Sequence, residues 1–265
     1  MSRILITGAT GLLGRELVQL ATDDHHHVRA LSRRPKLHPL THEIEWRQGD
    51  LKTGAGMQAA VQDMQIVIHA ATSPFLQTKK VDVEGTRRLL EYAAAAGVEH
   101  FIFPSIVGIE KIPFSYYQQK LTAEAIVRAG GVPWTILRAT QFHALIDKFL
   151  QPARHLPIML LPVDFKFQPL DGREMAARLM ACVAEGPAGR ISDMGGPVVH
   201  ALGEMAKVWL QVRGVRRKVA RLALPGGTAN AFRRGENTTP EHAEGKMTWQ
   251  QWLQQRYEKN SNSGE

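Results

Sequence analysis

Short apolar runs alternate with amphipathic stretches through the first half of the chain. The apolar runs are rich in Val, Ile and Leu, which is typical of buried parallel strands, and the stretches between them have apolar residues at helical spacing. We predict strands at 4–6, 27–31, 44–47, 65–69, 100–103 and 134–138, and helices at 13–20, 56–62, 81–96 and 116–129. This order predicts an α/β fold, a Rossmann-type doubly wound parallel sheet with helices on both faces.

The pattern changes after about Phe142. Prolines at 152, 157, 162 and 169 divide the chain into short pieces, and helical patterns follow at 173–184, 203–212 and 248–257. Trp249 and Trp252 are expected to be packing anchors, with a binding role as the alternative. We therefore expect a dinucleotide-binding domain over 1–145, a smaller C-terminal α+β substrate lobe over 146–258 that is partly interwoven with the sheet, and a disordered tail over 259–265.

Composition limits the possible classes of protein. With 44% hydrophobic and 22% charged residues, the chain is expected to be soluble and globular. Its net charge is +8, but the basic residues are scattered and lack a nucleic-acid-binding pattern, so we do not expect nucleic acid as a partner. Cys182 is the only cysteine, which favours a reducing compartment and a buried, inert thiol. Because we find neither a signal peptide nor an apolar run of membrane-spanning length, we expect a cytoplasmic protein with no membrane partner.

The loop behind the first strand carries the strongest functional signal. Gly8 permits a tight turn, Gly11 allows close approach to a phosphate, and Gly14 lets the following helix pack on the strand. A strand, a glycine-rich loop and a helix in this order place backbone N–H groups where a pyrophosphate binds. The residues predicted to bind it are Gly8, Thr10, Gly11, Leu12, Leu13 and Gly14.

The second predicted strand ends in Ser32, Arg33 and Arg34. An NAD-selective site usually has a carboxylate at this point for the ribose 2′-hydroxyl, and this chain has none. Two guanidinium groups can instead bind a 2′-phosphate. We therefore predict NADP(H) in preference to NAD(H), although a solvated basic loop is the alternative.

Three polar residues are candidates for catalysis. Ser105 follows the fifth strand, while Tyr116 and Lys120 are four residues apart and share one helix face. A Tyr phenol can donate a proton as hydride reaches a carbonyl carbon, and an adjacent ammonium would lower the pKa of that phenol. Ser105 would orient the carbonyl, and Lys120 would also hold the nicotinamide ribose. Two alternatives stay open: an exposed helix start without catalytic function, or Tyr117 as the residue that points inward.

These segments together resemble the short-chain dehydrogenase/reductase superfamily, and more narrowly its atypical NmrA-like and triphenylmethane-reductase-like NAD(P)-binding members. The resemblance implies that Asp50 and Leu51 lie against the adenine, that Ala70, Ala71 and Thr72 line the cofactor groove, and that the segment from Ala139 to Phe142 closes over the nicotinamide. Asp50 as a helix cap and the alanines as packing residues are the alternatives. The segments that carry the resemblance are 7–14, 49–51, 81–86, 96–105, 116–120 and 133–139.

The chain departs from this family in two ways: Asp82 stands where extended relatives usually have Asn, and Tyr116 is present although the atypical branch often keeps only the Lys. We expect an NADPH-dependent reductase of a small apolar or aromatic acceptor such as a quinone, carbonyl or conjugated compound. A non-catalytic NADP(H)-binding regulator and a nucleotide-sugar epimerase or dehydratase are the alternatives, and a homo-oligomer or protein partner stays open. No metal site is expected at the three consecutive histidines 25–27. The acceptor pocket is expected to use Phe142, His143, Phe165 and Phe167.

Overall fold

The computed structural model describes residues 1–34, 44–74, 76–152 and 156–261. The chain divides into two compact units, and each is described here by itself. Unit 1 consists of Met1–Ser105, Phe114–Arg138 and Arg173–Ser192, and unit 2 of Ile106–Pro113, Ala139–Gly172 and Asp193–Glu265. The segment 173–192 returns to unit 1 with a helix and a strand of the sheet, and the segment 106–113 belongs to unit 2.

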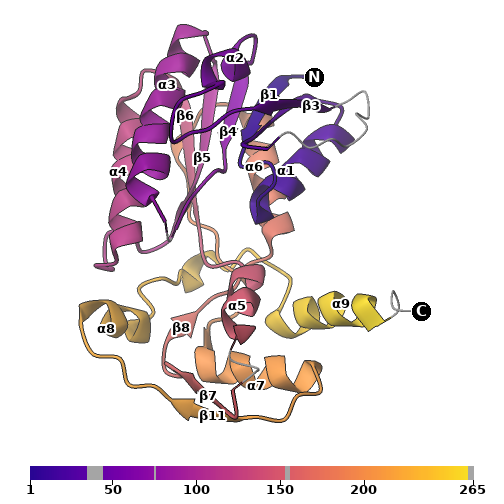
Figure 1. Ribbon diagram of the computed structural model, residues 1–265, viewed down its shortest axis with the longest axis vertical. Helices are drawn as coiled ribbons and strands as arrows, with labels where there is room; N and C mark the ends of the chain where they lie inside the picture. Colours follow the sequence, from indigo (N-terminus) through magenta and orange to yellow (C-terminus); the bar gives the residue numbers. More distant parts are fainter. Residues whose placement is uncertain (35–43, 75, 153–155, 262–265) are drawn as a thin grey trace. The chain divides into compact units, whose positions relative to one another are not determined.

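Unit 1 is built on a seven-stranded sheet with the order β3-β2-β1-β4-β5-β6-β9 (Figure 1). Parallel pairings join β3 to β2, β2 to β1, β1 to β4, β4 to β5 and β6 to β9. The order changes direction between β1 and β4, as in Rossmann folds, which confirms the predicted fold class. The strands are β1 (Arg3–Thr7), β2 (His27–Ser32), β3 (Ile44–Gln48), β4 (Ile66–His69), β5 (His100–Ile106), β6 (Trp134–Ala139) and β9 (Gly189–Arg190).

Helices cover both faces of this sheet, with α2, α3 and α4 on one face and α1 and α6 on the other (Figure 1). The helix predicted over 81–96 has two parts, because a π-helical turn, η1 (Lys79–Glu84), precedes an α-helix that begins at Gly85. The helices are α1 (Leu12–Asp23), α2 (Met57–Val61), α3 (Gly85–Ala95), α4 (Ser115–Ala129) and α6 (Gly172–Glu185).

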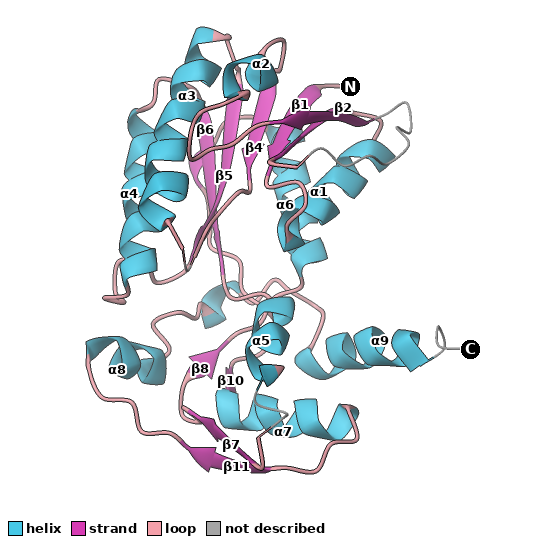
Figure 2. Cartoon of the chain, viewed as in Figure 1, coloured by secondary structure: helices cyan, strands magenta, loops and turns pink. Residues whose placement is uncertain are grey.

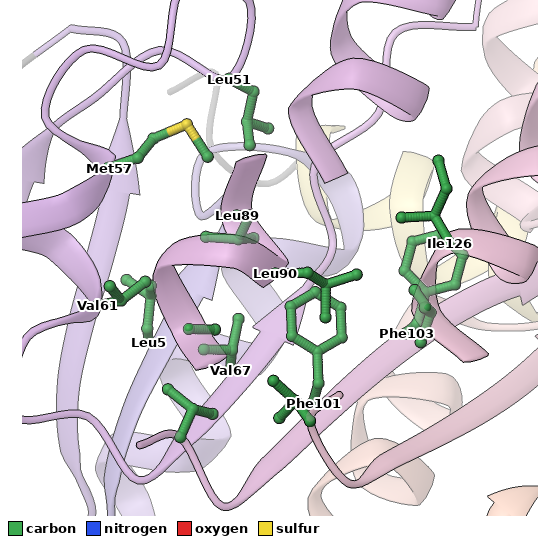
Figure 3. Packing of buried hydrophobic residues seen from close by; sticks show 14 of the residues in the cluster. Leu5, Leu51, Met57, Val61, Val67, Leu89, Leu90, Phe101, Phe103 and Ile126 are labelled. Atoms are coloured by element: carbon green, nitrogen blue, oxygen red, sulfur yellow. The ribbon is translucent and has the colours of Figure 1, made fainter. Parts of the chain in front are cut away.

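One core layer of unit 1 lies between the sheet and the layer of α2, α3 and α4 (Figure 3). Leu5, Val67 and Phe101 extend from three neighbouring strands towards Leu89 of α3, and all four side chains are buried. Cys182 of α6 is also buried, as expected, and burial raises the pKa of its thiol. This packing fixes the strand ends that carry the polar residues described below.

Unit 2 combines short strands with four helices among its described residues, in agreement with an α+β lobe (Figure 2). Strands β8 (Lys166–Phe167) and β10 (His200–Ala201) pair in antiparallel fashion, and β7 (Ile158–Leu161) and β11 (Lys218–Arg221) pair in parallel. The helices are α5 (His143–Leu150), α7 (Leu202–Val212), α8 (Gly227–Arg234) and α9 (Trp249–Ser261), and a 3-10 turn, η3, spans Pro240–His242. Helix α9 extends three residues into the segment expected to be disordered, and 262–265 lie outside the described residues.

Aromatic side chains pack among aliphatic ones in the core of unit 2. Trp249 and Trp252 are buried in it, as expected of packing anchors. His143 stacks on both indoles, with ring centroids 5.8 and 5.7 Å apart, and Phe165 stacks on Phe232 at 5.4 Å. The rings of His143 and Phe165 are thus used in packing within unit 2, and their part in an acceptor pocket stays a prediction.

Candidate functional site

The candidate site lies at the carboxyl ends of β1 and β4, where the strand order of unit 1 changes direction. Ligands of open α/β sheets bind at such a point. The last residues of the two strands, Thr7 and His69, are directly paired in the register. Gly8 follows the first and Ala70 the second, so the predicted phosphate loop and the segment 70–72 leave the sheet side by side.

Close packing explains the glycines of the predicted phosphate loop. Gly8 has a φ of +65°, and a Cβ on it would lie 2.7 Å from the Ala71 Cα. A Cβ on Gly14 would lie 2.1 Å from the Gly8 carbonyl oxygen, and one on Gly11 would lie 3.1 Å from the same atom. Side chains at these positions would therefore push the loop away from the strand ends.

The start of α1 fits an anionic group. Its N-cap is Gly11, which has no side chain to cap the helix, and the first turn contains no acidic residue. The N-terminal N–H groups and the positive end of the helix dipole therefore have no competing carboxylate in that turn. Leu12 is exposed and Leu13 is buried, and Arg15 Nε donates to the Thr10 carbonyl at 3.0 Å. The loop thus fits the pyrophosphate of a dinucleotide.

His69 is the centre of a buried cluster of hydrogen bonds, which we call the His69 cluster, with Thr7 and Thr86. Its Nδ1 lies 2.7 Å from Thr7 Oγ1 and its Nε2 lies 3.0 Å from Thr86 Oγ1. Thr86 Oγ1 donates its proton to the Asp82 carbonyl at 2.6 Å, so it accepts from His69 Nε2–H. His69 Nδ1 then accepts from Thr7, whose oxygen accepts the Ala71 N–H at 3.2 Å. Each donor hydrogen in this cluster therefore has a single acceptor.

The imidazole of His69 is therefore neutral, with its proton on Nε2. Burial, followed by the positive charge of Lys120, lowers the pKa of His69 to about 3. The rings of Phe101 and Phe103 lie 5.8 and 5.7 Å from the imidazole and surround it with apolar surface. The His69 cluster joins β1, β4 and α3, and through the hydrogen bond from Thr86 to the Asp82 carbonyl it also holds η1.

A second group of hydrogen bonds, which we call the Tyr116 cluster, consists of Tyr116, Thr72 and Asp82. Thr72 Oγ1 donates to Asp82 Oδ1 at 2.5 Å and lies 3.0 Å from the Tyr116 hydroxyl. The Ser73 N–H donates to the other carboxylate oxygen of Asp82 at 2.8 Å. Because the single Thr72 proton is used on Asp82, the Tyr116 hydroxyl donates to Thr72. Its own oxygen lone pairs stay available to a ligand.

The environment of Tyr116 keeps its phenol protonated. Burial raises the pKa of this phenol, and the charge of Asp82 adds to the rise, while the hydrogen bond with Thr72 opposes it. The expected lowering of that pKa by the neighbouring ammonium is therefore wrong, because burial and Asp82 determine the direction. Tyr117 lies on another side of α4, is buried, and packs its ring 5.6 Å from Phe114.

Lys120 is buried one helical turn after Tyr116. Its Nζ donates to the Pro104 carbonyl at 3.1 Å and lies 3.9 Å from the centroid of the Phe103 ring. Burial lowers the pKa of Lys120, although the charges of Asp82 and Glu124 oppose that shift. The ammonium has three donor hydrogens and the carbonyl takes one, so Lys120 can also hold a ribose hydroxyl.

Ser105 is not joined to Tyr116 or Lys120 by a hydrogen bond within the described residues. Its Oγ is buried beside Glu124, which forms a two-pronged ion pair with Arg138 at 2.7 Å for each contact. Burial alone would raise the pKa of Glu124, but Arg138 together with Ser105 outweighs it and the pKa is lowered. The carbonyl-orienting role of Ser105 stays a prediction, and Thr72 lies closer to the phenol.

The residues predicted to bind the adenosine half of the cofactor have contacts that do not by themselves indicate a ligand. Arg33 and Arg34 are exposed after β2, and neither forms an ion pair with any residue the structure describes. Asp50 Oδ1 accepts the Lys52 N–H at 2.9 Å, which stabilises its own turn rather than capping a helix. Leu51 is buried in the core against Gly85. Their contacts with adenine and a 2′-phosphate stay predictions.

Ala139 and Phe142 belong to unit 2. Ala139 forms a parallel bridge with Met194, and Phe142 forms one with Leu170 and is the N-cap of α5. Their predicted contact with a nicotinamide stays a prediction. Neither the His69 cluster nor a role for Asp82 was predicted from the sequence. The sequence signal for the cluster was a polar residue, His69, at the end of a buried strand. The signal for Asp82 was its place shortly before the Gly85-Thr86 pair.

Known proteins with similar sequences and structures share this architecture. The profile of a family described as NAD(P)H-binding matches residues 8–146. The photosystem II assembly factor Ycf39 of Trieres chinensis is 28% identical over 83% of this chain and 72% of its own length. A (4-alkanoyl-5-oxo-2,5-dihydrofuran-3-yl)methyl phosphate reductase of Streptomyces griseus is 31% identical over 73% of this chain and 68% of its own.

Solved structures agree on the fold. The NADPH complex of the quinone oxidoreductase QOR2 from Escherichia coli has a TM-score of 0.79 at 19% identity, and the match covers 96% of this chain and 99% of that one. No helix among the described residues combines the length and apolar character that crossing a membrane requires. The profile match confirms that the chain belongs to an NAD(P)H-binding family, as expected.

Proposed function

We propose that this chain, which belongs to the NAD(P)H-binding family, is an NADPH-dependent reductase of a small apolar or aromatic acceptor such as a quinone, carbonyl or conjugated compound. The observation that carries the proposal is the Tyr116 cluster. A protonated phenol lies at the carboxyl edge of the sheet, hydrogen-bonded to Thr72 and one helical turn before the buried ammonium of Lys120. This is the arrangement that a proton donor to a reduced oxygen needs.

NADPH supplies the hydride when it is bound. When the acceptor is a carbonyl, the Tyr116 O–H turns from Thr72 and gives its proton to the carbonyl oxygen, because the alkoxide that forms there is a stronger base than the phenolate. The Thr72 hydroxyl turns from Asp82 to donate to that phenolate, and this hydrogen bond stabilises it. The raised pKa of Tyr116 favours reduction over the reverse oxidation, because oxidation begins from the phenolate.

The test is NADPH oxidation by the purified protein with a panel of quinones, aldehydes and enones. Tyr116→Phe keeps the ring and deletes the hydroxyl, so turnover should fall about 10²-fold with NADPH affinity nearly unchanged. Turnover that survives in Tyr116→Phe would mean that the acceptor takes its proton from water. That result would overturn the proposed role of the phenol.

The cofactor preference has its own test. If Arg33 and Arg34 bind the 2′-phosphate, NADPH should bind about 10-fold more tightly than NADH, equivalent to about 1.4 kcal/mol. Arg33→Ala with Arg34→Ala should remove that preference and leave NADH affinity unchanged. Equal affinities of the unmodified protein for the two cofactors, measured by titration, would contradict this assignment.

A non-catalytic NADP(H)-binding regulator is the second candidate. It is favoured by the similarity over 83% of the chain to a protein named as an assembly factor. In that case NADPH would bind tightly and no acceptor of the panel would be reduced. Tyr116→Phe would then change neither the affinity for NADPH nor the rate of NADPH oxidation.

A further inference from the structure

One face of a two-stranded ribbon in unit 2 is apolar and exposed. In β7, Met159 and Leu161 are buried, whereas Ile158 and Leu160 are 44% and 55% exposed. Side chains alternate between the two faces of a strand, so Ile158 and Leu160 project from the outer face. This ribbon has no further strand on either edge within the described residues.

The neighbouring strand β11 extends the same face. Lys218 pairs with Ile158, and Ala220 pairs with Leu160, so both lie on the outer side of the ribbon. Leu222, directly after β11, and Leu156, before β7, are also exposed. Several aliphatic side chains are therefore exposed in this region, where a solvent-facing surface usually has polar side chains. Such a group of exposed aliphatic side chains indicates an interaction surface.

A basic groove adjoins this apolar face. It is open, has a volume of about 920 Å³, and lies between α7 and the start of the ribbon. Leu210, Val215 and Val219 supply apolar lining, together with Pro157. The charged side chains that line it are all cations, namely Lys207, Arg216, Arg217 and Lys218.

These cations have no charge partner within the part of the chain that the structure describes. None of the four forms an ion pair there, and no carboxylate lines the groove. Arg221 and Arg233 nearby differ, because both pair with Asp164, at 2.8 and 2.9 Å. The groove thus presents uncompensated positive charge beside exposed aliphatic surface.

We propose that this face, formed by the basic groove and the outer side of the β7–β11 ribbon, docks on the surface of a membrane that contains anionic lipids. The four cations contact lipid phosphates, and Ile158 and Leu160 enter the boundary between headgroups and acyl chains. Each basic side chain near such a surface contributes about 1 kcal/mol, and aliphatic insertion adds to it. Such peripheral binding requires no spanning helix, and it is independent of the proposed reductase activity.

Two other occupants fit the surface less well. A second copy of the chain would use the same patch on both partners, and the lining of the groove offers no carboxylate to neutralise the cations. Nucleic acid would be expected to meet aromatic or amide side chains between the cations, and the lining contains none. Both remain outcomes that the experiment distinguishes.

The experiment is co-sedimentation of the full-length protein with vesicles. Phosphatidylcholine vesicles are compared with vesicles in which about 30% of the lipid is phosphatidylglycerol, at low and at high salt. We expect binding to the anionic vesicles only, and release by salt. Arg216→Gln with Arg217→Gln should weaken that binding about 30-fold, the equivalent of about 2 kcal/mol.

Lys79→Gln with Lys80→Gln is the matched control, because it removes the same charge from exposed residues of unit 1. This control should bind the anionic vesicles within about twofold of the unmodified protein. Ile158→Ser with Leu160→Ser should weaken binding even at low salt, which separates insertion from charge attraction alone. Unchanged NADPH affinity shows that each variant is folded.

Several results would overturn the proposal. One is equal binding to neutral and anionic vesicles, or binding to neither. Another is an equal loss in the Lys79 and Lys80 control, which would point to net charge rather than this face. Binding to an oligonucleotide without binding to vesicles would assign the groove to nucleic acid. A dimer that dissociates in Ile158→Ser with Leu160→Ser, measured by sedimentation velocity without lipid, would assign the face to a second copy.

Discussion

The His69 cluster and the Tyr116 cluster lie on the same segments of unit 1 but differ in how firmly their protons are placed. In the first, Thr7, His69 and Thr86 are all buried, and each donor has one acceptor. In the second, Thr72 is exposed and Tyr116 is partly exposed, and the phenol oxygen can still accept a hydrogen bond.

This difference separates a structural function from a chemical one. A buried cluster with every proton placed holds its three elements in one arrangement, and any change leaves a polar group without a partner. A hydroxyl chain that ends near solvent can reverse the direction of its hydrogen bonds at little cost. Asp82 contacts both clusters. Its backbone carbonyl accepts from Thr86 of the His69 cluster, and its side-chain carboxylate accepts from Thr72 in the Tyr116 cluster.

The largest effect is expected from His69→Leu. Leu has a similar size, but it leaves the Thr7 hydroxyl without its acceptor and Thr86 without its donor. The free energy of unfolding should fall by about 3 kcal/mol, because two buried hydrogen bonds are lost. Urea denaturation followed by circular dichroism measures the change. A loss below about 0.5 kcal/mol would contradict a structural function for the His69 cluster.

The pH dependence of stability sharpens this assignment. Unfolded His takes up a proton below about 6.5, whereas His69 in the folded chain stays neutral down to about 3. The unfolded state therefore binds more protons in this range, and the stabilisation present above pH 6.5 is lost as the pH falls towards 3. From this residue alone the free energy of unfolding should drop by about 2 kcal/mol between pH 7 and pH 5.

His69→Gln removes the titrating group and serves as the control for that measurement. Part of the pH dependence should persist in it, because burial also lowers the pKa of His100, to about 4. The difference in slope between the unmodified protein and His69→Gln is the quantity to compare. Equal slopes would show that the pKa of His69 is not lowered in the folded chain.

Thr72→Val tests the other side of the comparison. It keeps the size of the side chain and removes the hydroxyl between Tyr116 and Asp82. Turnover should fall about 10-fold, while the free energy of unfolding changes by about 1 kcal/mol or less, because Thr72 is exposed. Thr72→Ser restores the hydroxyl and should restore most of the turnover. A Val variant that is unstable but fully active would reverse the roles of the two clusters.

The sequence predicted the sheet of unit 1 well because its elements are long and strongly periodic. Unit 2 was harder, since α8 begins at Gly227, contains few apolar residues, and is defined by its packing rather than by its pattern. The strands β8, β9 and β10 have two residues each, too few to show alternation.

Local spacing was informative for Tyr116 and Lys120, because four residues bring two side chains to one face of a helix. It could not show whether Tyr116 or Tyr117 faces Thr72, since the two are adjacent and both are aromatic. The role of Asp82 could not be predicted from the sequence for a different reason. It lies in a π-helical turn, and its partner Thr72 comes from a loop ten residues earlier, so the contact depends on the tertiary fold.

The smallest effect is expected from Tyr117→Phe, which distinguishes the two neighbouring tyrosines. Its ring packs against Phe114 and is kept in the variant, and the Tyr116–Thr72–Asp82 hydrogen bonds are untouched. Turnover should therefore stay within about twofold of the unmodified protein, against a 10²-fold loss in Tyr116→Phe. Parallel assays of NADPH oxidation with one acceptor measure both variants. If instead Tyr117→Phe loses activity and Tyr116→Phe keeps it, the proton donor is Tyr117, and the Tyr116 cluster has only a structural function.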